Sequence, residues 1–261
     1  MDLRLAGRRA LVTASSGGIG AAVARQLGRE GCTVLVHGRD RTRADSVAGE
    51  LQAMGAAAEV MLGDIANHDD AAALADHARA WGVEILVNNA GPFAEHDWNS
   101  ADLQSWVDSF EGNVVTAVRM IRAVVPGMRT AGWGRIINIG SRAATTPLPN
   151  MVDYSAAKAA VLNLTASLAH SLANSGVTAN IVSPGIIRTE GLERMFERRA
   201  ADAGWNENQK EQAMAEYAPN PAGRLGTSGD IANAVAYLAS PLAGYVNGTE
   251  LRVDGGISPL A

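Results

Sequence analysis

The sequence lacks the features of secreted and membrane proteins. Its 261 residues include one cysteine, Cys32, so no internal disulfide can form, which is typical of a reducing compartment. Cys32 stands at the start of an apolar run and is expected to fill the core. No apolar run approaches the roughly 18 to 20 residues that span a bilayer. The first residues, Met1 to Arg4, lack the layout of a signal peptide. These absences predict a cytoplasmic protein with no membrane contact.

Basic clusters and metal-ligand patterns are also missing. Lys and Arg number 22 against 27 Asp and Glu, and no basic run stands out, so no nucleic-acid partner is expected. No metal site is predicted, because metal-ligand spacing is absent among the five histidines, His37, His68, His77, His96 and His170. With 47% hydrophobic residues the chain can bury a sizeable core, and with 19% charged residues it does not resemble a disordered chain.

What is present is a regular alternation of short apolar runs and longer helical segments. The runs that indicate strands are 10–13, 33–37, 59–62, 85–87, 135–139, 177–182 and 250–253. Helical segments at 21–30, 43–54 and 69–81 are each followed closely by a glycine. This order predicts an α/β fold, a doubly wound, Rossmann-like parallel sheet of about seven strands with helices on both faces. No linker or repeat divides the chain, so residues 1–261 are expected to form one domain.

The segment 186–227 departs from this alternation. It is long and highly charged, and it contains the breaker Pro219-Asn220-Pro221. Within it Leu192, Met195, Phe196 and Arg199 recur at helical spacing, which predicts a short amphipathic helix. A long connection of this kind is often a lid over a binding site, and the alternative is a surface helix packed on the domain edge. Together with residues 147–152, this segment is expected to line a substrate pocket.

A glycine-rich turn, Thr13-Ala14-Ser15-Ser16-Gly17-Gly18-Ile19-Gly20, lies between the first strand and the first helix. A dinucleotide pyrophosphate needs a backbone that it can approach closely and a helix N-terminus directed at its charge. Side chains at Gly18 and Gly20 would obstruct that approach. Glycines also serve simply to turn a chain, but the strand, turn and helix context favours phosphate binding here.

The end of the second strand bears on the choice of dinucleotide. An acidic residue there would bind the ribose 2'-hydroxyl of NAD, whereas an arginine would accommodate the 2'-phosphate of NADP. Gly38 stands where the acid is expected, and Arg39 follows it. NADP(H) is therefore favoured. Asp40 keeps NAD(H) open, because strand boundaries read from sequence are uncertain by a residue or two.

Tyr154 and Lys158 lie four residues apart on a predicted helix, with Asp153 as its expected cap. A tyrosine with a pKa of about 10 exchanges protons poorly at neutral pH, but a neighbouring ammonium can lower that pKa. The pair could then act as a general acid or base. Such spacing is common on surface helices, so the pair alone is weak evidence.

Other polar groups follow strand ends, where open α/β sheets bind ligands. Ser141 follows the fifth strand, Asn88-Asn89-Ala90-Gly91 ends the fourth and Pro184-Gly185 closes the sixth. Taken together, these motifs resemble the short-chain dehydrogenase/reductase family, and in particular its 3-oxoacyl-carrier-protein reductase-like branch. The resemblance extends from the glycine turn to the terminal Val253-Asp254-Gly255-Gly256.

The resemblance implies a catalytic tetrad of Asn113, Ser141, Tyr154 and Lys158. Tyr154 would donate the proton in reduction, Lys158 would bind the nicotinamide ribose and lower the tyrosine pKa, Ser141 would polarise the carbonyl, and Asn113 would hold a relay water. Asp64 would contact adenine, and Ile187 and Thr189 would meet the carboxamide. The full set of expected cofactor contacts is Thr13, Ser15, Ser16, Gly18, Ile19, Gly20, Arg39, Asp64, Ile65, Asn89, Ala90, Gly91, Tyr154, Lys158, Pro184, Gly185, Ile187 and Thr189.

One position departs from the family pattern. The family's glycine turn usually begins Thr-Gly, and Ala14 replaces that glycine. We expect Ala14 to fit with a negative φ and to have a minor effect on binding. Ser15, Ser16 and Gly17 supply no basic residue inside the turn, so Arg39 carries most of the argument for NADP.

The sequence therefore predicts an NADP(H)-dependent oxidoreductase that reduces a ketone or a 3-oxoacyl group. An NAD-linked alcohol or sugar dehydrogenase is a second reading, and a non-catalytic NADP(H)-sensing protein is a third. An acyl carrier protein partner would need a basic surface, for which the candidates are Arg122, Arg129, Arg194, Arg198 and Arg199. By resemblance, the helices that carry Asn113 and Tyr154 would pack against partner subunits in a homotetramer, and Trp98 and Trp106 are expected to serve packing or subunit contacts.

Overall fold

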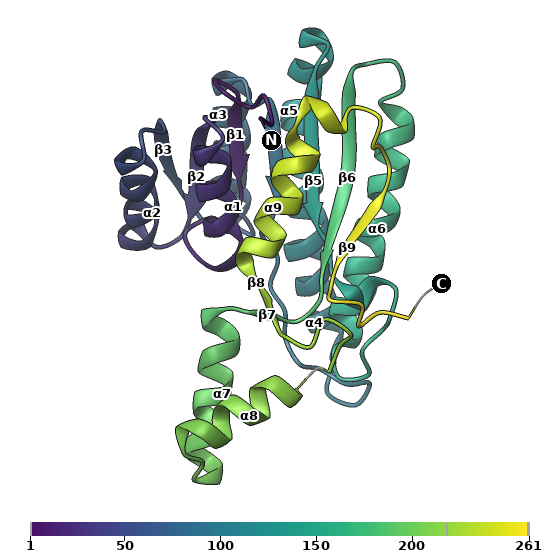
Figure 1. The fold of residues 1–261 in the computed structure, drawn as a ribbon. Coiled ribbons are helices and arrows are strands. Elements are labelled where there is room, and N and C mark those ends of the chain that lie inside the picture. Colours follow the sequence, from purple (N-terminus) through teal and green to yellow (C-terminus); the bar gives the residue numbers. More distant parts are fainter. Residues whose placement is uncertain (1, 218, 260–261) are drawn as a thin grey trace.

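The computed structural model describes residues 2–217 and 219–259. A seven-stranded parallel sheet forms its centre, in the order β3-β2-β1-β4-β5-β6-β9 (Figure 1). The strands are β1 Arg9–Val12, β2 Thr33–Gly38, β3 Ala58–Leu62, β4 Ile85–Asn88, β5 Gly134–Ile139, β6 Val177–Pro184 and β9 Glu250–Val253. The doubly wound sheet predicted from the sequence is confirmed, and each predicted strand agrees with the observed one to within two residues at either end.

Helices cover both faces of this sheet. Helices α1 Gly18–Arg29, α2 Arg41–Ala53 and α9 Ser228–Ala239 pack against one face, where Val12, Val34 and Val36 point. Helices α3 His68–Trp81, α5 Thr116–Ala131 and α6 Val152–Ser171 pack against the other, where Leu11 and Leu35 point. Because successive strand side chains point to opposite faces, continuous apolar runs such as Ala10 to Val12 are buried on both sides.

The sheet reverses its winding between β1 and β4, which are neighbours in space although β2 and β3 separate them in sequence. Open α/β sheets bind ligands outside the carboxyl ends of their strands at such a point. The segments that follow β1 and β4 are the glycine turn and the run from Asn89 to Gly91. The topology therefore brings together motifs that are about 75 residues apart in the chain.

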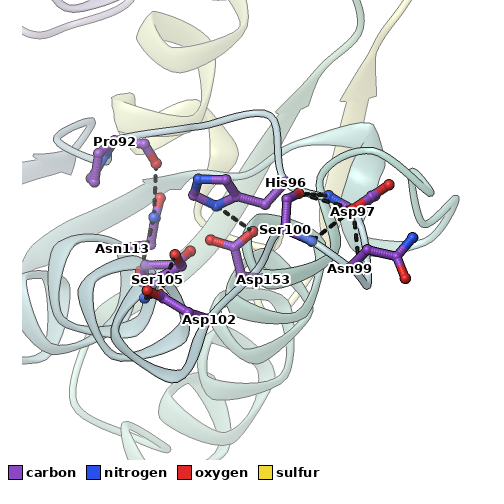
Figure 2. A network of polar contacts seen from close by, with 10 residues as sticks. Pro92, His96, Asp97, Asn99, Ser100, Asp102, Ser105, Asn113 and Asp153 are labelled. Carbon is purple, nitrogen blue, oxygen red and sulfur yellow. Dashed lines mark hydrogen bonds and ion pairs between the residues drawn. The ribbon is translucent and has the colours of Figure 1, made fainter.

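Helix α6 begins differently from the prediction. Met151 is its N-cap and makes no side-chain capping hydrogen bond, so the expected cap at Asp153 is wrong. Asp153 lies in the first helical turn, where its buried carboxylate faces His96 Nδ1 at 3.5 Å (Figure 2). Val152 N donates to His96 O, so this contact fastens the chain after β4 to the start of α6. Because the Asp153 carboxylate is directed at His96, it does not cap the N-terminus of α6.

The segment 186–227 contains two helices, where the sequence predicted one. Helix α7 Glu190–Ala203 and helix α8 Glu207–Glu216 lie between the short paired strands β7 Ile187–Arg188 and β8 Gly226–Thr227. The two helices project from the body of the molecule beyond β7 and β8 (Figure 1). Phe196 of α7 is buried, and its ring lies edge-on to Tyr217 at 5.3 Å between centroids.

Shorter elements complete the fold: α4 Leu103–Phe110, a π-helical turn Glu111–Val115, and 3-10 turns at Arg142–Ala144 and Pro241–Ala243. Within residues 2–217 and 219–259, the structure has no helix with both the length and the apolar character to cross a bilayer.

Candidate active site

A cleft of about 710 Å³ opens at the carboxyl ends of the central strands. Its walls are the start of α1, the ends of β4, β5 and β6, the start of α6 and the inner side of α7. Of the predicted site residues, those that line it are Gly18, Ile19, Asn89, Gly91, Ser141, Tyr154, Lys158, Pro184, Gly185, Ile187 and Thr189. The topology thus gathers the glycine turn, the strand ends and the Tyr154–Lys158 pair around one space.

Tyr154 and Lys158 converge as their spacing on α6 predicts. Lys158 Nζ lies 5.6 Å from the centroid of the Tyr154 ring and donates a hydrogen bond of 3.0 Å to Ile139 O at the end of β5. Ser141 follows that strand, and its Oγ accepts a hydrogen bond from Ala143 N, which fixes the serine at the start of a 3-10 turn. Phe93 also lines the cleft, and its ring lies edge-on to the Tyr154 ring at 6.3 Å between centroids.

Burial governs the protonation of this pair. Desolvation raises the pKa of the Tyr154 phenol, and a hydrogen bond from Ser141 opposes that rise. Desolvation also lowers the pKa of Lys158 to about 8. Tyr154 is therefore a neutral phenol at pH 7, the form that can donate a proton. The net direction of its pKa shift is upward, opposite to the lowering expected from Lys158.

Asn113 lies in the π-helical turn between α4 and α5. Its Nδ2 donates to Pro92 O at 3.0 Å and to Ser109 O at 2.9 Å (Figure 2). Its Oδ1 is buried and has no hydrogen-bond partner among the described residues. A side chain at Gly91 would overlap this oxygen and approach Lys158 Nζ. Asn113 Oδ1 and Lys158 Nζ therefore border the same small space, which only a glycine at position 91 leaves open.

The glycine turn has a geometry that partly differs from the prediction. Gly18 has φ +55°, and a Cβ there would point into open space, as expected at a surface that a ligand approaches. A Cβ at Gly20 would instead overlap Ala14 O and Asn89 Nδ2, so Gly20 is needed for packing inside the protein. The expectation of a negative φ at Ala14 is wrong, because its φ is +52°. Ala14 adopts the left-handed conformation that glycine would adopt without strain.

Two residues predicted to contact the cofactor, Thr13 and Ser15, use their hydroxyls for hydrogen bonds within the protein. Thr13 Oγ1 accepts hydrogen bonds from Asn89 N and Ala90 N, both at 2.9 Å, and so ties β1 to the end of β4. Ser15 Oγ donates to Val12 O and accepts from His37 N. Both residues are buried. Their contribution to a cofactor site is therefore to hold the shape of the turn.

The residues at the end of β2 bear on whether the site binds NADP or NAD. A Cβ at Gly38 would overlap the Ser16 side chain, so an acidic side chain has no room at this position. Asp40 is the N-cap of α2, where its Oδ1 accepts a hydrogen bond from Arg43 N. Arg39 remains largely exposed and pairs with Asp64 at 3.3 Å. Asp40, which kept NAD open, is thus engaged in capping, and the Arg39 guanidinium, paired with Asp64 but largely exposed, is accessible to a phosphate.

Two arginines that the sequence reasoning did not assign also lie at the cleft. Arg43 extends over Gly17 and forms an ion pair of 2.7 Å with Glu190 at the start of α7. Arg142 follows Ser141 directly and lines the cleft. Its place beside a predicted catalytic serine was the available indication, but no motif marks it. Clusters of His, Cys, Asp or Glu fit to hold a metal ion are absent from the described part of the chain.

Comparison with known proteins identifies the class. Residues 13–258 match the family model described as enoyl-(acyl carrier protein) reductase. The chain is 36% identical over 257 residues to the 3-oxoacyl-[acyl-carrier-protein] reductase of Vibrio cholerae, covering 98% of this chain and 99% of the relative. The chain belongs to the short-chain dehydrogenase/reductase family and is an oxidoreductase of that family.

Solved structures agree with this assignment. The structure of L-sorbose reductase from Gluconobacter frateurii, complexed with NADPH and L-sorbose, superposes with a TM-score of 0.95 at 30% identity and full coverage of both chains. A 3-oxoacyl (acyl-carrier-protein) reductase from Agrobacterium tumefaciens with NADP bound has a TM-score of 0.88 at 31% identity, covering 98% of this chain and 96% of that one.

The residues present fit a dinucleotide. Helix α1 begins at Gly17 without a side-chain capping hydrogen bond, so its first backbone N–H groups are available to a phosphate. The absent side chain of Gly18 leaves the approach to this terminus open. The buried, unpartnered Asn113 Oδ1 is a further polar atom that a bound group or water would satisfy.

Proposed function

We propose that this protein is an NADP(H)-dependent carbonyl reductase whose catalytic residues are Ser141, Tyr154, Lys158 and Asn113. The observation that carries the proposal is the convergence of a neutral, half-buried Tyr154 and a buried Lys158 beside Ser141 in the cleft. A nucleotide-sensing protein without catalysis would need the glycine turn but not this arrangement.

In the proposed reaction, NADPH supplies a hydride to the carbonyl carbon. Tyr154 donates its phenolic proton to the carbonyl oxygen, and Ser141 holds that oxygen with a hydrogen bond. Lys158 stabilises the phenolate that remains. A water between Asn113 Oδ1 and Lys158 Nζ would have two polar partners and would return a proton from solvent to Tyr154. The products are a secondary alcohol and NADP+.

Several features support NADP(H) over NAD(H). Gly38 has no room for an acid, Asp40 caps α2, and Arg39 is exposed at the end of β2. The solved relatives described above were obtained with NADPH or NADP. The remaining cofactor contacts predicted from the sequence, including Asp64, Ile65, Pro184 and Ile187, are part of the same proposal. An arginine that pairs with a phosphate contributes a charge-assisted hydrogen bond.

Replacing Arg39 by alanine tests this cofactor assignment. We expect KM for NADPH to rise about 10-fold, as for the loss of one hydrogen bond to a charged group, while KM for NADH changes little. Arg41→Ala is the matched control, because Arg41 is also an exposed arginine paired with an aspartate, but it is the first residue of α2 and not the end of β2. Equal KM changes for the two cofactors would remove the phosphate role from Arg39.

The substrate class within this function is a ketone, a 3-oxoacyl group or a keto sugar, and an acyl carrier protein partner stays part of the proposal for the 3-oxoacyl case. NADPH oxidation followed by absorbance against a 3-oxoacyl thioester, simple ketones, diketones, quinones and keto sugars tests it. Turnover of one class supports the reductase. Silence across the panel together with tight NADPH binding would support the sensor instead.

A further inference from the structure

Arg142 has a guanidinium that the protein itself does not satisfy. It occupies the first position of the 3-10 turn Arg142–Ala144, directly after Ser141, and lines the cleft. Its Nε is buried without a hydrogen-bond partner among the described residues, and none of the ion pairs found within 2–217 and 219–259 includes it. Burying a donor without a hydrogen bond costs free energy, and a ligand that accepts a hydrogen bond from the Nε would remove that cost.

The rest of the cleft is also rich in positive charge, although the chain as a whole has a formal net charge of -5. Among the described residues its lining includes six cationic side chains, Arg43, Lys158, Arg142, Arg194, Arg198 and Arg199, and three acidic ones, Glu95, Glu190 and Asp202. Glu190 is already paired with both Arg43 and Arg194. The field in the cleft therefore attracts anions.

The position of each arginine limits which group it can bind. Arg43 lies over the glycine turn, on the cofactor side, and Arg199 stacks on the rings of Phe196 and Tyr217 at 5.3 Å. Arg142 follows Ser141 directly in the chain and lines the same cleft, so it is the cleft arginine next in sequence to the serine proposed to hold the carbonyl. A small substrate held by both residues would carry its anion only a few bonds from the carbonyl.

We propose that the substrate is a small oxo acid, whose carbonyl is held by Ser141 and Tyr154 and whose carboxylate is bound by Arg142. The inference rests on the proposed reductase function and narrows its substrate class. The planar guanidinium matches a carboxylate through two parallel hydrogen bonds, which gives direction as well as affinity. A long 3-oxoacyl thioester places no anion beside its carbonyl and would leave Arg142 unpaired.

The first test compares oxo acids with their uncharged esters. Acetoacetate, 4-oxopentanoate and 5-oxohexanoate are assayed with NADPH against the matching methyl esters. We expect wild-type kcat/KM to favour at least one acid over its ester by on the order of 10- to 100-fold, the value of a hydrogen bond to a charged group. Arg142→Met should abolish that preference and retain turnover of the ester, and Arg142→Lys should restore part of it. Arg29→Met, at an exposed arginine at the far end of α1, is the control and should behave as wild type.

A second measurement reports carboxylate binding without turnover. Succinate added to the complex with NADP+ should raise the Tm of the wild-type protein and of Arg29→Met but leave that of Arg142→Met unchanged.

Equal turnover of acids and esters, with no effect of succinate on the Tm, would overturn the oxo-acid assignment while leaving the reductase function intact. If kcat/KM for dihydroxyacetone phosphate exceeds that for dihydroxyacetone and for every acid, the group bound by Arg142 is a phosphate and not a carboxylate, and the oxo-acid assignment is wrong. Absence of NADPH oxidation with all ketones would contradict the proposed function, and a Tm shift with succinate that requires Arg142 would still support the carboxylate site.

Discussion

Ala14 is the residue at which the glycine turn is under strain. Its φ of +52° is a conformation in which an L-residue costs roughly 1 to 2 kcal/mol, and its carbonyl oxygen and amide are fixed by Asn89 Nδ2 and His37 Nδ1. The turn therefore keeps a geometry suited to glycine although the sequence supplies alanine.

The replacement Ala14→Gly should stabilise the protein by about 1 kcal/mol, because relief of the left-handed strain exceeds the extra entropy of glycine in the unfolded chain. Urea unfolding at pH 7.5 measures the change. The control is Ala22→Gly, inside α1, which should destabilise the protein by about 1 kcal/mol. A loss of stability in both variants would contradict the strain argument.

His37 connects the glycine turn to β2 in its neutral form. The residue is buried, Nδ1 accepts a hydrogen bond of 3.2 Å from Ala14 N, and burial lowers the pKa of the imidazole from 6.5 to about 4. The unfolded chain therefore binds a proton between these two pH values that the folded protein excludes. The stability from this group is complete above pH 6.5 and is lost as the pH falls toward 4.

We expect wild-type stability to decrease by roughly 3 kcal/mol more than that of His37→Gln between pH 7.5 and pH 4, at 1.36 kcal/mol per pKa unit. Glutamine keeps an acceptor for Ala14 N but does not titrate. Urea unfolding at intervals of half a pH unit gives both curves. Parallel curves for the two proteins would show that His37 titrates normally in the folded state.

At the scale of elements, the pair of helices α7 and α8 is held mainly by its own contacts. The Phe196 ring lies edge-on to Tyr217, and Arg199 stacks on both rings, while the ion pairs of Arg188 in β7 with Glu211 and of Arg43 in α2 with Glu190 join the helices to the rest of the molecule. Units with few contacts to the main core open locally at a low free energy. Since α7 also forms one wall of the cleft, such opening would expose the substrate.

Phe196→Ala should loosen this pair of helices without unfolding the sheet. We expect faster proteolysis within 189–217, a several-fold higher KM for the carbonyl substrate, and a change in global Tm smaller than that for Leu35→Ala in the core of the sheet. Limited proteolysis, kinetics and thermal unfolding measure the three effects. A drop in Tm as large as that of Leu35→Ala would show that the pair of helices unfolds together with the core.

The sequence predicted some elements better than others for physical reasons. The inner strands of the main sheet are buried, continuous apolar runs and were found, as were the partly exposed edge strands β3 and β9, whereas the two-residue strands β7 and β8 are too short to leave a pattern. Helix α8 has few apolar residues and therefore no hydrophobic periodicity, and the only indication of it was the capping pair Asn206 and Gln209. In the π-helical turn, Asn113 donates one hydrogen bond locally to Ser109 O and a second to Pro92 O, 21 residues earlier in the chain, and a contact of the second kind leaves no local pattern.

The same limits apply to the site. Motif spacing placed Ser141, Tyr154 and Lys158 correctly in one cleft, because each follows a strand end or starts a helix next to one. Motif spacing could not show that the hydroxyls of Thr13 and Ser15 form hydrogen bonds within the protein, or that Asp40 caps α2. The bonds of Thr13 to Asn89 and of Ser15 to His37 join segments that are distant in sequence, whereas the Asp40 cap is local and depends on the residue at which α2 begins. Arg142 was overlooked because an unpaired guanidinium is visible only when its surroundings are known.

At the scale of the whole molecule, the fold positions the chemistry at one end of the sheet and leaves α4 with exposed apolar side chains. Leu103 and Val107 on this helix are exposed, and Trp98 before it packs on Trp106 while remaining mostly in solvent. The homotetramer implied by the family resemblance would cover such residues. This oligomeric state stays a prediction, and sedimentation analysis of the mass in solution tests it. Asn113, one of the proposed catalytic residues, lies in the turn that follows α4 directly.

The most direct test of the central claim is transfer of deuterium from NADPH labelled at C4 of the nicotinamide to a ketone, in wild type and in Tyr154→Phe. We predict that the wild-type protein places deuterium on the carbinol carbon of the product. Tyr154→Phe should lose about 10²- to 10⁴-fold in rate, the contribution of a positioned general acid, while still binding NADPH. Near-normal transfer by Tyr154→Phe, or transfer by neither protein to any ketone, would contradict the account.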